Sequence, residues 1–210
     1  MDGHARSWMA LIALGAFHGV NPAMGWLFAV ALGLQEHRRA AVLRALLPLA
    51  LGHALAIVAV IAIAILAGLT VPLHYIRWVV AAILIGVGLR FLIRHPHLRW
   101  AGMRVGMADL TLWSFLVASD HGAGLMVLPI FLGMSAVHAS ADTSHMMSGT
   151  PAAAIAAVVL HTSSYLLVTG AVALLVFEKL GVGVLRKAWL NVDLVWATAL
   201  MGTGAATLVM

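Results

Sequence analysis

The chain has 210 residues, of which 63% are hydrophobic and only 9% are charged, and its mean hydropathy is +1.06. A soluble domain needs far more surface charge, so the composition indicates an integral membrane protein. Cysteine is absent from the sequence, which excludes disulfides, thiol relays and thiolate metal ligands. At about 20 apolar residues per crossing, the length leaves room for six transmembrane helices in a single transmembrane domain, residues 1–210, and for no separate soluble domain.

The first apolar segment, about residues 8–34, is interrupted near its centre by a polar, helix-breaking stretch. This stretch runs from His18 to Pro22, includes Asn21, and is followed closely by Met24. Polar side chains are costly at membrane depth and usually face a protein interior or a cavity there. Pro22 removes a backbone donor, so the unwound backbone can coordinate an ion or a substrate, or can simply kink the helix.

Five further apolar runs predict five more helices, so we expect an all-α fold with six spans. They cover about residues 43–68, 74–94, 106–134, 151–177 and 187–210. The second span carries His53 and the fifth carries His161. The fourth contains another polar interruption, Asp120-His121-Gly122, with Gly124 and Met126 after it.

The basic residues indicate an orientation. Ten lysines and arginines fall on one side of the predicted spans, and Arg6 and Arg77 fall on the other; the ten are Arg38, Arg39, Arg44, Arg90, Arg94, Arg99, Arg104, Lys179, Arg186 and Lys187. By the positive-inside rule the first side is cytoplasmic. Both termini are then outside, which is the periplasm if the membrane is a bacterial inner membrane. The loop at residues 137–147 also faces out, as either a metal-collecting lip or an ordinary polar loop.

Short motifs recur in the same order in the two halves of the chain. His18-Gly19 corresponds to His121-Gly122, Leu51-Gly52-His53 corresponds to Leu160-His161, and residues 85–88 correspond to residues 201–204. A unit of three helices crosses the membrane an odd number of times, so a second copy enters from the opposite face. We therefore expect two inverted three-helix repeats, about residues 8–94 and 106–210, as is usual in secondary transporters.

This 3+3 arrangement, with kinked His or Pro motifs in the first helix of each half, resembles the lysine-exporter superfamily. That superfamily includes nickel/cobalt permeases, and sulfite exporters and DsbD-like thiol-relay membrane proteins are related to it. The nickel permeases carry a His, four further residues and then an Asp-His pair on one helix, whereas this chain has Asp120-His121 without the upstream His. The thiol-relay proteins need a cysteine next to the kink proline, and Ala23 follows Pro22 here. The resemblance implies transport, whereas the missing cysteine excludes electron transfer through thiols.

Four histidines, one in each of four predicted spans, begin about ten to fifteen residues into their helices and so occupy a similar depth. Neutral imidazole suits Zn, Cu, Fe or Ni, and a carboxylate would add a charge that changes with protonation. The predicted metal ligands are these histidines and one Asp: His18, His53, Asp120, His121 and His161. Asn21 and Ser164 complete the predicted binding site. The alternative is that each polar side chain makes only a hydrogen bond between helices.

The sequence thus predicts a secondary transporter for a small solute, above all a transition-metal cation, with a His/Asp/Asn site at the membrane midplane. No nucleotide-binding loop is present, so a gradient would supply the energy, with Asp120 or a His coupling protons. The alternative function is a metal- or haem-dependent membrane redox protein or enzyme that uses the same histidines. The expected partners are the bilayer and the solute or ion, with homo-oligomerisation left open and no nucleic acid. No catalytic residue is predicted.

Overall fold

The structure is a computed structural model that describes residues 3–68, 72–93, 106–139, 151–180 and 192–209. All regular structure in these ranges is helical, which confirms the predicted all-α fold class. The elements are α1 (Gly3–Val20), the 3₁₀ turn η1 (Pro22–Met24), α2 (Trp26–Glu36), α3 (Arg39–Gly68), α4 (Leu73–Ile93), α5 (Met107–Asp120), α6 (Ala123–Ala139), α7 (Pro151–Leu175), the π-helical turn η2 (Val176–Leu180) and α9 (Val192–Val209). Residues 140–147, which form most of the predicted outer loop, lie outside the described residues.

The predicted interruption of the first apolar segment is a break between α1 and α2. The Asn21 side chain accepts a hydrogen bond of 3.0 Å from the backbone N–H of Ala23 and so caps the turn η1. Pro22 follows at the first position of that turn, where a missing N–H costs nothing. The indole N–H of Trp26 donates to the carbonyl of Val20, 2.9 Å away, and ties the start of α2 to the end of α1. Local polar contacts therefore stabilise the break.

The second predicted interruption is a sharp bend between α5 and α6. The two helices meet at 61° across a break of a few residues. Gly122 has a φ of +70°, a left-handed conformation that glycine adopts without steric cost. The carbonyl of Gly122 then accepts the N–H of Met126 at 2.9 Å, which starts α6. The glycine of the His-Gly motif is thus the residue that turns the chain.

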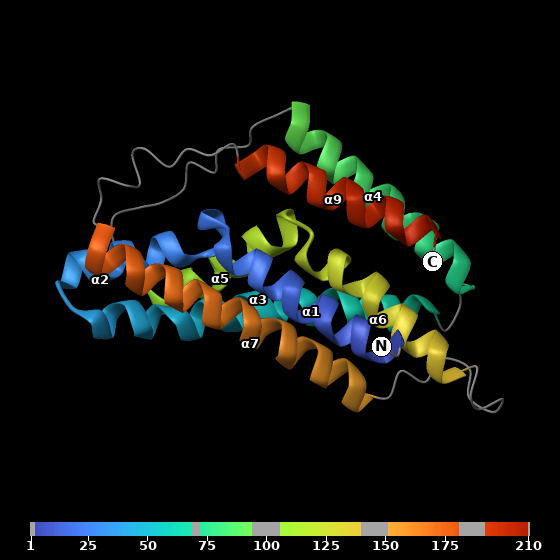
Figure 1. Cartoon of the computed structure of the whole chain (residues 1–210), viewed down its shortest axis with the longest axis horizontal. Helices are drawn as coiled ribbons and strands as arrows, with labels where there is room; N and C mark the ends of the chain where they lie inside the picture. Colours follow the sequence, from blue (N-terminus) through green and yellow to red (C-terminus); the bar gives the residue numbers. More distant parts are fainter. Residues whose placement is uncertain (1–2, 69–71, 94–105, 140–150, 181–191, 210) are drawn as a thin grey trace.

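The helices pack in two groups (Figure 1). α1 lies along α7, and α3 lies along both α5 and α7. α4 lies along α9, and this pair is set to one side of the other helices, which it contacts through α3 and α6. Buried apolar side chains such as Leu11, Ile57 and Met126 form the core among the central helices.

The described helices are consistent with a membrane protein. By length and composition, Arg39–Gly68 and Ala152–Lys179 can each cross a membrane, and the bent pair α5 and α6 makes a third span if it is counted as one. Large apolar side chains cover their outer faces, and Leu47 and Leu167 are 76% and 73% exposed. Such side chains are stable in lipid and unfavourable in water. The described part of the chain therefore holds two or three candidate spans.

Candidate metal centre

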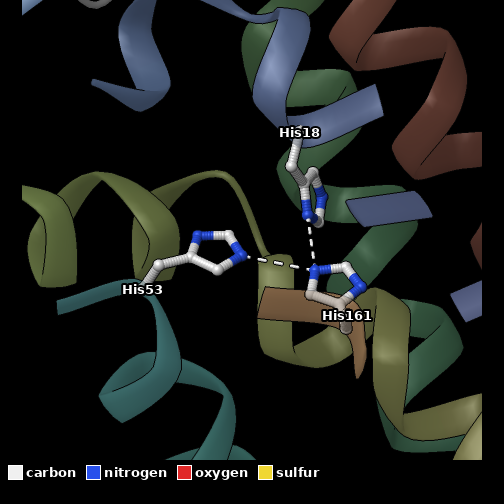
Figure 2. Close-up of side chains that lie close together, drawn as sticks. All are labelled: His18, His53 and His161. Carbon is white, nitrogen blue, oxygen red and sulfur yellow. Dashed lines mark hydrogen bonds between the residues drawn. The ribbon is translucent and has the colours of Figure 1, made fainter. Parts of the chain in front are cut away.

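Three of the predicted histidines meet inside the protein. His18 comes from the last turn of α1, His53 from the middle of α3 and His161 from α7, and all three are fully buried. Their side chains point toward one another (Figure 2), and one ring nitrogen from each lies within 4.8 Å of the other two. His161, more than a hundred positions from both other histidines in the sequence, thus joins them in one group of nitrogen ligands.

Close packing of α1 on α7 creates this meeting point. A Cβ atom on Gly15 would collide with the carbonyl oxygen of His161, and a Cβ on Gly19 would lie 2.6 Å from that of Tyr165. Small residues at such positions let the backbones of membrane helices approach closely. His18 lies between the two glycines in sequence and is therefore held against α7. In the first half of the chain, Gly19 of the His-Gly motif therefore permits the close approach of α1 to α7.

His161 occupies the centre of the group. Its Nε2 lies 3.0 Å from Nδ1 of His18 and 3.3 Å from Nε2 of His53. Its Nδ1 lies 3.1 Å from the carbonyl oxygen of Leu11, which can only accept a hydrogen bond. Nδ1 of His161 therefore carries the proton, and in the neutral ring the lone pair is on Nε2, facing the other two imidazoles. A backbone carbonyl that fixes the tautomer in this way is typical of metal-binding histidines.

An aromatic contact holds His53 in place. Its ring stacks on the ring of Tyr165, with centroids 4.1 Å apart and an angle of 12° between the planes. The Tyr165 hydroxyl donates a hydrogen bond of 2.6 Å to the carbonyl of Met24 in the turn η1. Nδ1 of His53 has no hydrogen-bond partner among the described residues. The break in the first helix is therefore connected to the histidine group through Tyr165.

Two of the three nitrogen separations within the group suit a single metal ion, and the third, between His18 and His53, is within 4.8 Å. Two imidazole nitrogens bound at tetrahedral angles to one Zn²⁺ are about 3.3 Å apart, given Zn–N bonds of about 2.0–2.1 Å. The two short nitrogen contacts of His161, 3.0 and 3.3 Å, are close to that value. Because a neutral His161 offers one lone pair, it cannot accept a full hydrogen bond from both neighbours, whereas one cation can accept a lone pair from all three rings.

The other predicted site residues have different partners. Asp120 lies at the end of α5, where Oδ1 is 3.1 Å from the Arg90 guanidinium on α4. His121 is buried next to it, and its Nδ1 donates to the carbonyl of Val117 at 2.9 Å. Asn21 caps the turn η1, and the hydroxyl of Ser164 donates to the carbonyl of Ile12 at 2.8 Å. None of these four residues belongs to the group formed by His18, His53 and His161.

Two contacts, one of the observed site and one of a predicted site residue, have no signal in the sequence. The Leu11 carbonyl orients His161, and a backbone atom of an apolar residue leaves no trace in residue type. Arg90 pairs with Asp120, although the position of Arg90 near the end of its span predicts only a role in topology. Tyr165 had a weak signal, since it follows His161 by one helical turn. Its contact with a third helix depends on packing that the sequence does not reveal.

No protein-family model, curated protein or solved structure matches this chain. The resemblance to the lysine-exporter superfamily therefore stays a prediction.

Proposed function

We propose that this chain is a membrane permease for a divalent transition-metal cation and that His18, His53 and His161 bind the cation during transport. The observation that carries the proposal is the convergence of three buried imidazoles from three different helices, with the central one oriented by a backbone carbonyl. Imidazole ligands without thiolate or carboxylate suit Zn²⁺, Cu²⁺, Ni²⁺ and Co²⁺ better than Mg²⁺ or Ca²⁺. The cargo class is therefore a borderline-soft divalent ion.

The location of the group beside a break in a helix supports transport rather than a purely structural role. His18 lies one turn before the break between α1 and α2, and Tyr165 bridges His53 to that break. Transporters commonly bind their substrates where membrane helices are discontinuous, because such segments rearrange at lower cost than continuous helices. We propose that movement at this break opens the site to one side of the membrane.

The packing of the helices supports two inverted repeats within six spans. Under the predicted correspondence, α1 on α7 is equivalent to α5 on α3, and both packings are extensive. The same correspondence exchanges α4 with α9, so each contact between them has a counterpart in the opposite direction. Gly88 packs against the Ala197 carbonyl, and Gly204 packs against the Ala81 carbonyl. Corresponding helices also run in opposite directions in Figure 1, where the colours follow the chain. We propose that both termini face the outside of a bacterial inner membrane.

The contact distances make haem the weaker of the two cofactor hypotheses. Haem held by two histidines needs the rings on opposite faces of a flat macrocycle. The ring nitrogens of the group are 3.0 and 3.3 Å apart, and Tyr165 covers a face of His53. This spacing accommodates one ion between the rings and leaves no room for a macrocycle.

Uptake of Zn²⁺ by proteoliposomes tests the proposed function. We expect saturable uptake by the wild-type protein, and a loss of at least about tenfold in Zn²⁺ affinity in His161→Ala, because the central ligand is removed. His37→Ala is the matched control, since His37 is exposed at the end of α2 and should leave binding unchanged. Equal Zn²⁺ binding by the wild-type and His161→Ala proteins would overturn the proposed site. Binding without uptake would overturn the proposed transport.

A further inference from the structure

The two His-Gly motifs correspond in sequence but differ in their contacts. His18 belongs to the group of three histidines, whereas His121 instead donates to the Val117 carbonyl. The chain geometry differs as well. The helix continues past Gly19 to Val20 in the first half, but ends before Gly122 in the second. The corresponding segments therefore adopt two different conformations in one structure.

His121 has the properties of an additional ligand. It is only 8% exposed. Its Nδ1 donates to a backbone carbonyl, so the lone pair of the neutral ring is on Nε2, as in His161. In His18 the nitrogen that faces the group is Nδ1, so His121 presents the equivalent nitrogen once it releases the Val117 carbonyl.

His53 and His161 also correspond to one another, and they too differ in their contacts. Nδ1 of His161 donates to the carbonyl of Leu11, seven residues before His18, whereas Nδ1 of His53 has no hydrogen-bond partner among the described residues. The residue seven before His121 is Ser114, which lies beside Gly52, the neighbour of His53. Ser114 is therefore the counterpart of Leu11 in the second half, and it packs against the turn of α3 that carries His53.

We infer that His121 replaces His18 as the third metal ligand in the opposite-facing state of the transporter. If two similar halves exchange conformations, the new state contains equivalent contacts, so its energy is close to that of the first. In that state Nδ1 of His53 donates to the Ser114 carbonyl, and His161 releases the Leu11 carbonyl. His53 and His161 hold the cation throughout, while His18 and His121 alternate. This inference rests on the proposed function.

Cobalt spectroscopy of single-cysteine variants tests the exchange. Because the wild-type chain has no cysteine, an absorption band from a Co²⁺–thiolate bond can only come from the introduced residue. We expect this band after Co²⁺ is added to His18→Cys and also after it is added to His121→Cys. His37→Cys, with an exposed thiol away from the site, should not show the band. A band in His18→Cys but not in His121→Cys would overturn the exchange and leave the proposed site standing.

Transport provides a second test that does not depend on a thiol. Zn²⁺ uptake should fall at least about tenfold in His121→Ala and by a similar factor in His18→Ala, because each state loses one of three ligands. Zn²⁺ binding by the purified His121→Ala protein shows that the variant is folded and that a loss of uptake is not a loss of structure. Uptake at the wild-type rate in His121→Ala would overturn the exchange. Absence of Zn²⁺ binding and uptake in the wild-type protein would overturn the proposed function itself, and the exchange with it.

Discussion

At the scale of single residues, Asp120 is a predicted metal ligand that the structure does not place in the group of three histidines. The sequence places a carboxylate beside His121, and the structure pairs it with Arg90 at 3.1 Å. The Asp120 side chain is 25% exposed and that of Arg90 is 50% exposed, so solvent screens much of their attraction. Ion pairs of this kind contribute about 0–1 kcal/mol to stability. The pair therefore connects α4 to the end of α5 without contributing a ligand to the group of three histidines.

Asp120→Asn tests whether the carboxylate binds the cation. We expect this substitution to change Zn²⁺ affinity by less than about threefold, because the amide keeps the shape of the side chain and Asp120 is not among the three ligand residues. Isothermal titration of the purified protein measures the affinity, and His161→Ala provides the contrasting loss. If Asp120→Asn weakens binding as much as His161→Ala does, Asp120 is a ligand.

The sequence could predict which residue types form the group, but not which of them meet. His18, His53 and His161 were predictable because a polar side chain in an apolar span is costly unless it has a partner or a function. Their mutual contact depends on the rotation of each helix about its axis, which packing determines. His121 carries the same signal and lies outside the group, since its segment ends α5 in a different conformation from the end of α1.

At the scale of helices, the apolar runs predicted the described segments within a few residues. The run at 43–68 is α3, which begins earlier, at Arg39, because helix formation continues into the basic turn. Breaks divide two of the six predicted spans, the first into α1 and α2 and the fourth into α5 and α6. Helical geometry is lost where Asn21 caps a new turn and where Gly122 adopts a positive φ. The sequence marks these points with Pro and Gly but does not give the bend angle.

Two glycines of α4, Gly86 and Gly88, provide a matched test of how α4 packs against α9. A Cβ on Gly88 would lie 2.7 Å from Cγ of Met201 and 3.0 Å from the carbonyl of Ala197, whereas one on Gly86 would meet no described atom within 4 Å. Gly88→Ala should therefore lower stability by about 1–3 kcal/mol through overpacking. Gly86→Ala should be neutral or stabilising by up to about 1 kcal/mol, since alanine favours a helix. Thermal unfolding in detergent measures both, and equal midpoints would contradict this packing.

At the scale of the whole molecule, the proposed two-fold relation connects the fold to the mechanism. Exchange of conformations between the halves requires that they be similar in structure and inserted in opposite directions. The Gly88 and Gly204 contacts are similar in both directions across α4 and α9, while the two His-Gly segments differ. A symmetric pair and an asymmetric site in one molecule are what a two-state transporter with inverted repeats requires. In the proposed mechanism this pair is the support against which the central helices move.

The insertion of the two halves can be measured with single cysteines, because the wild-type chain contains none. Arg6, near the start of α1, and Ala108, near the start of α5, are exposed and occupy nearly corresponding positions. In inverted repeats these positions face opposite sides of the membrane. A membrane-impermeant maleimide added to intact cells should therefore label Arg6→Cys, and should label Ala108→Cys only after the membrane is permeabilised. His37→Cys, in the basic turn between α2 and α3, is the control for the cytoplasmic side. Labelling of Arg6→Cys and Ala108→Cys from the same side would mean that the halves are parallel, and the ligand exchange between His18 and His121 would then lose its structural basis.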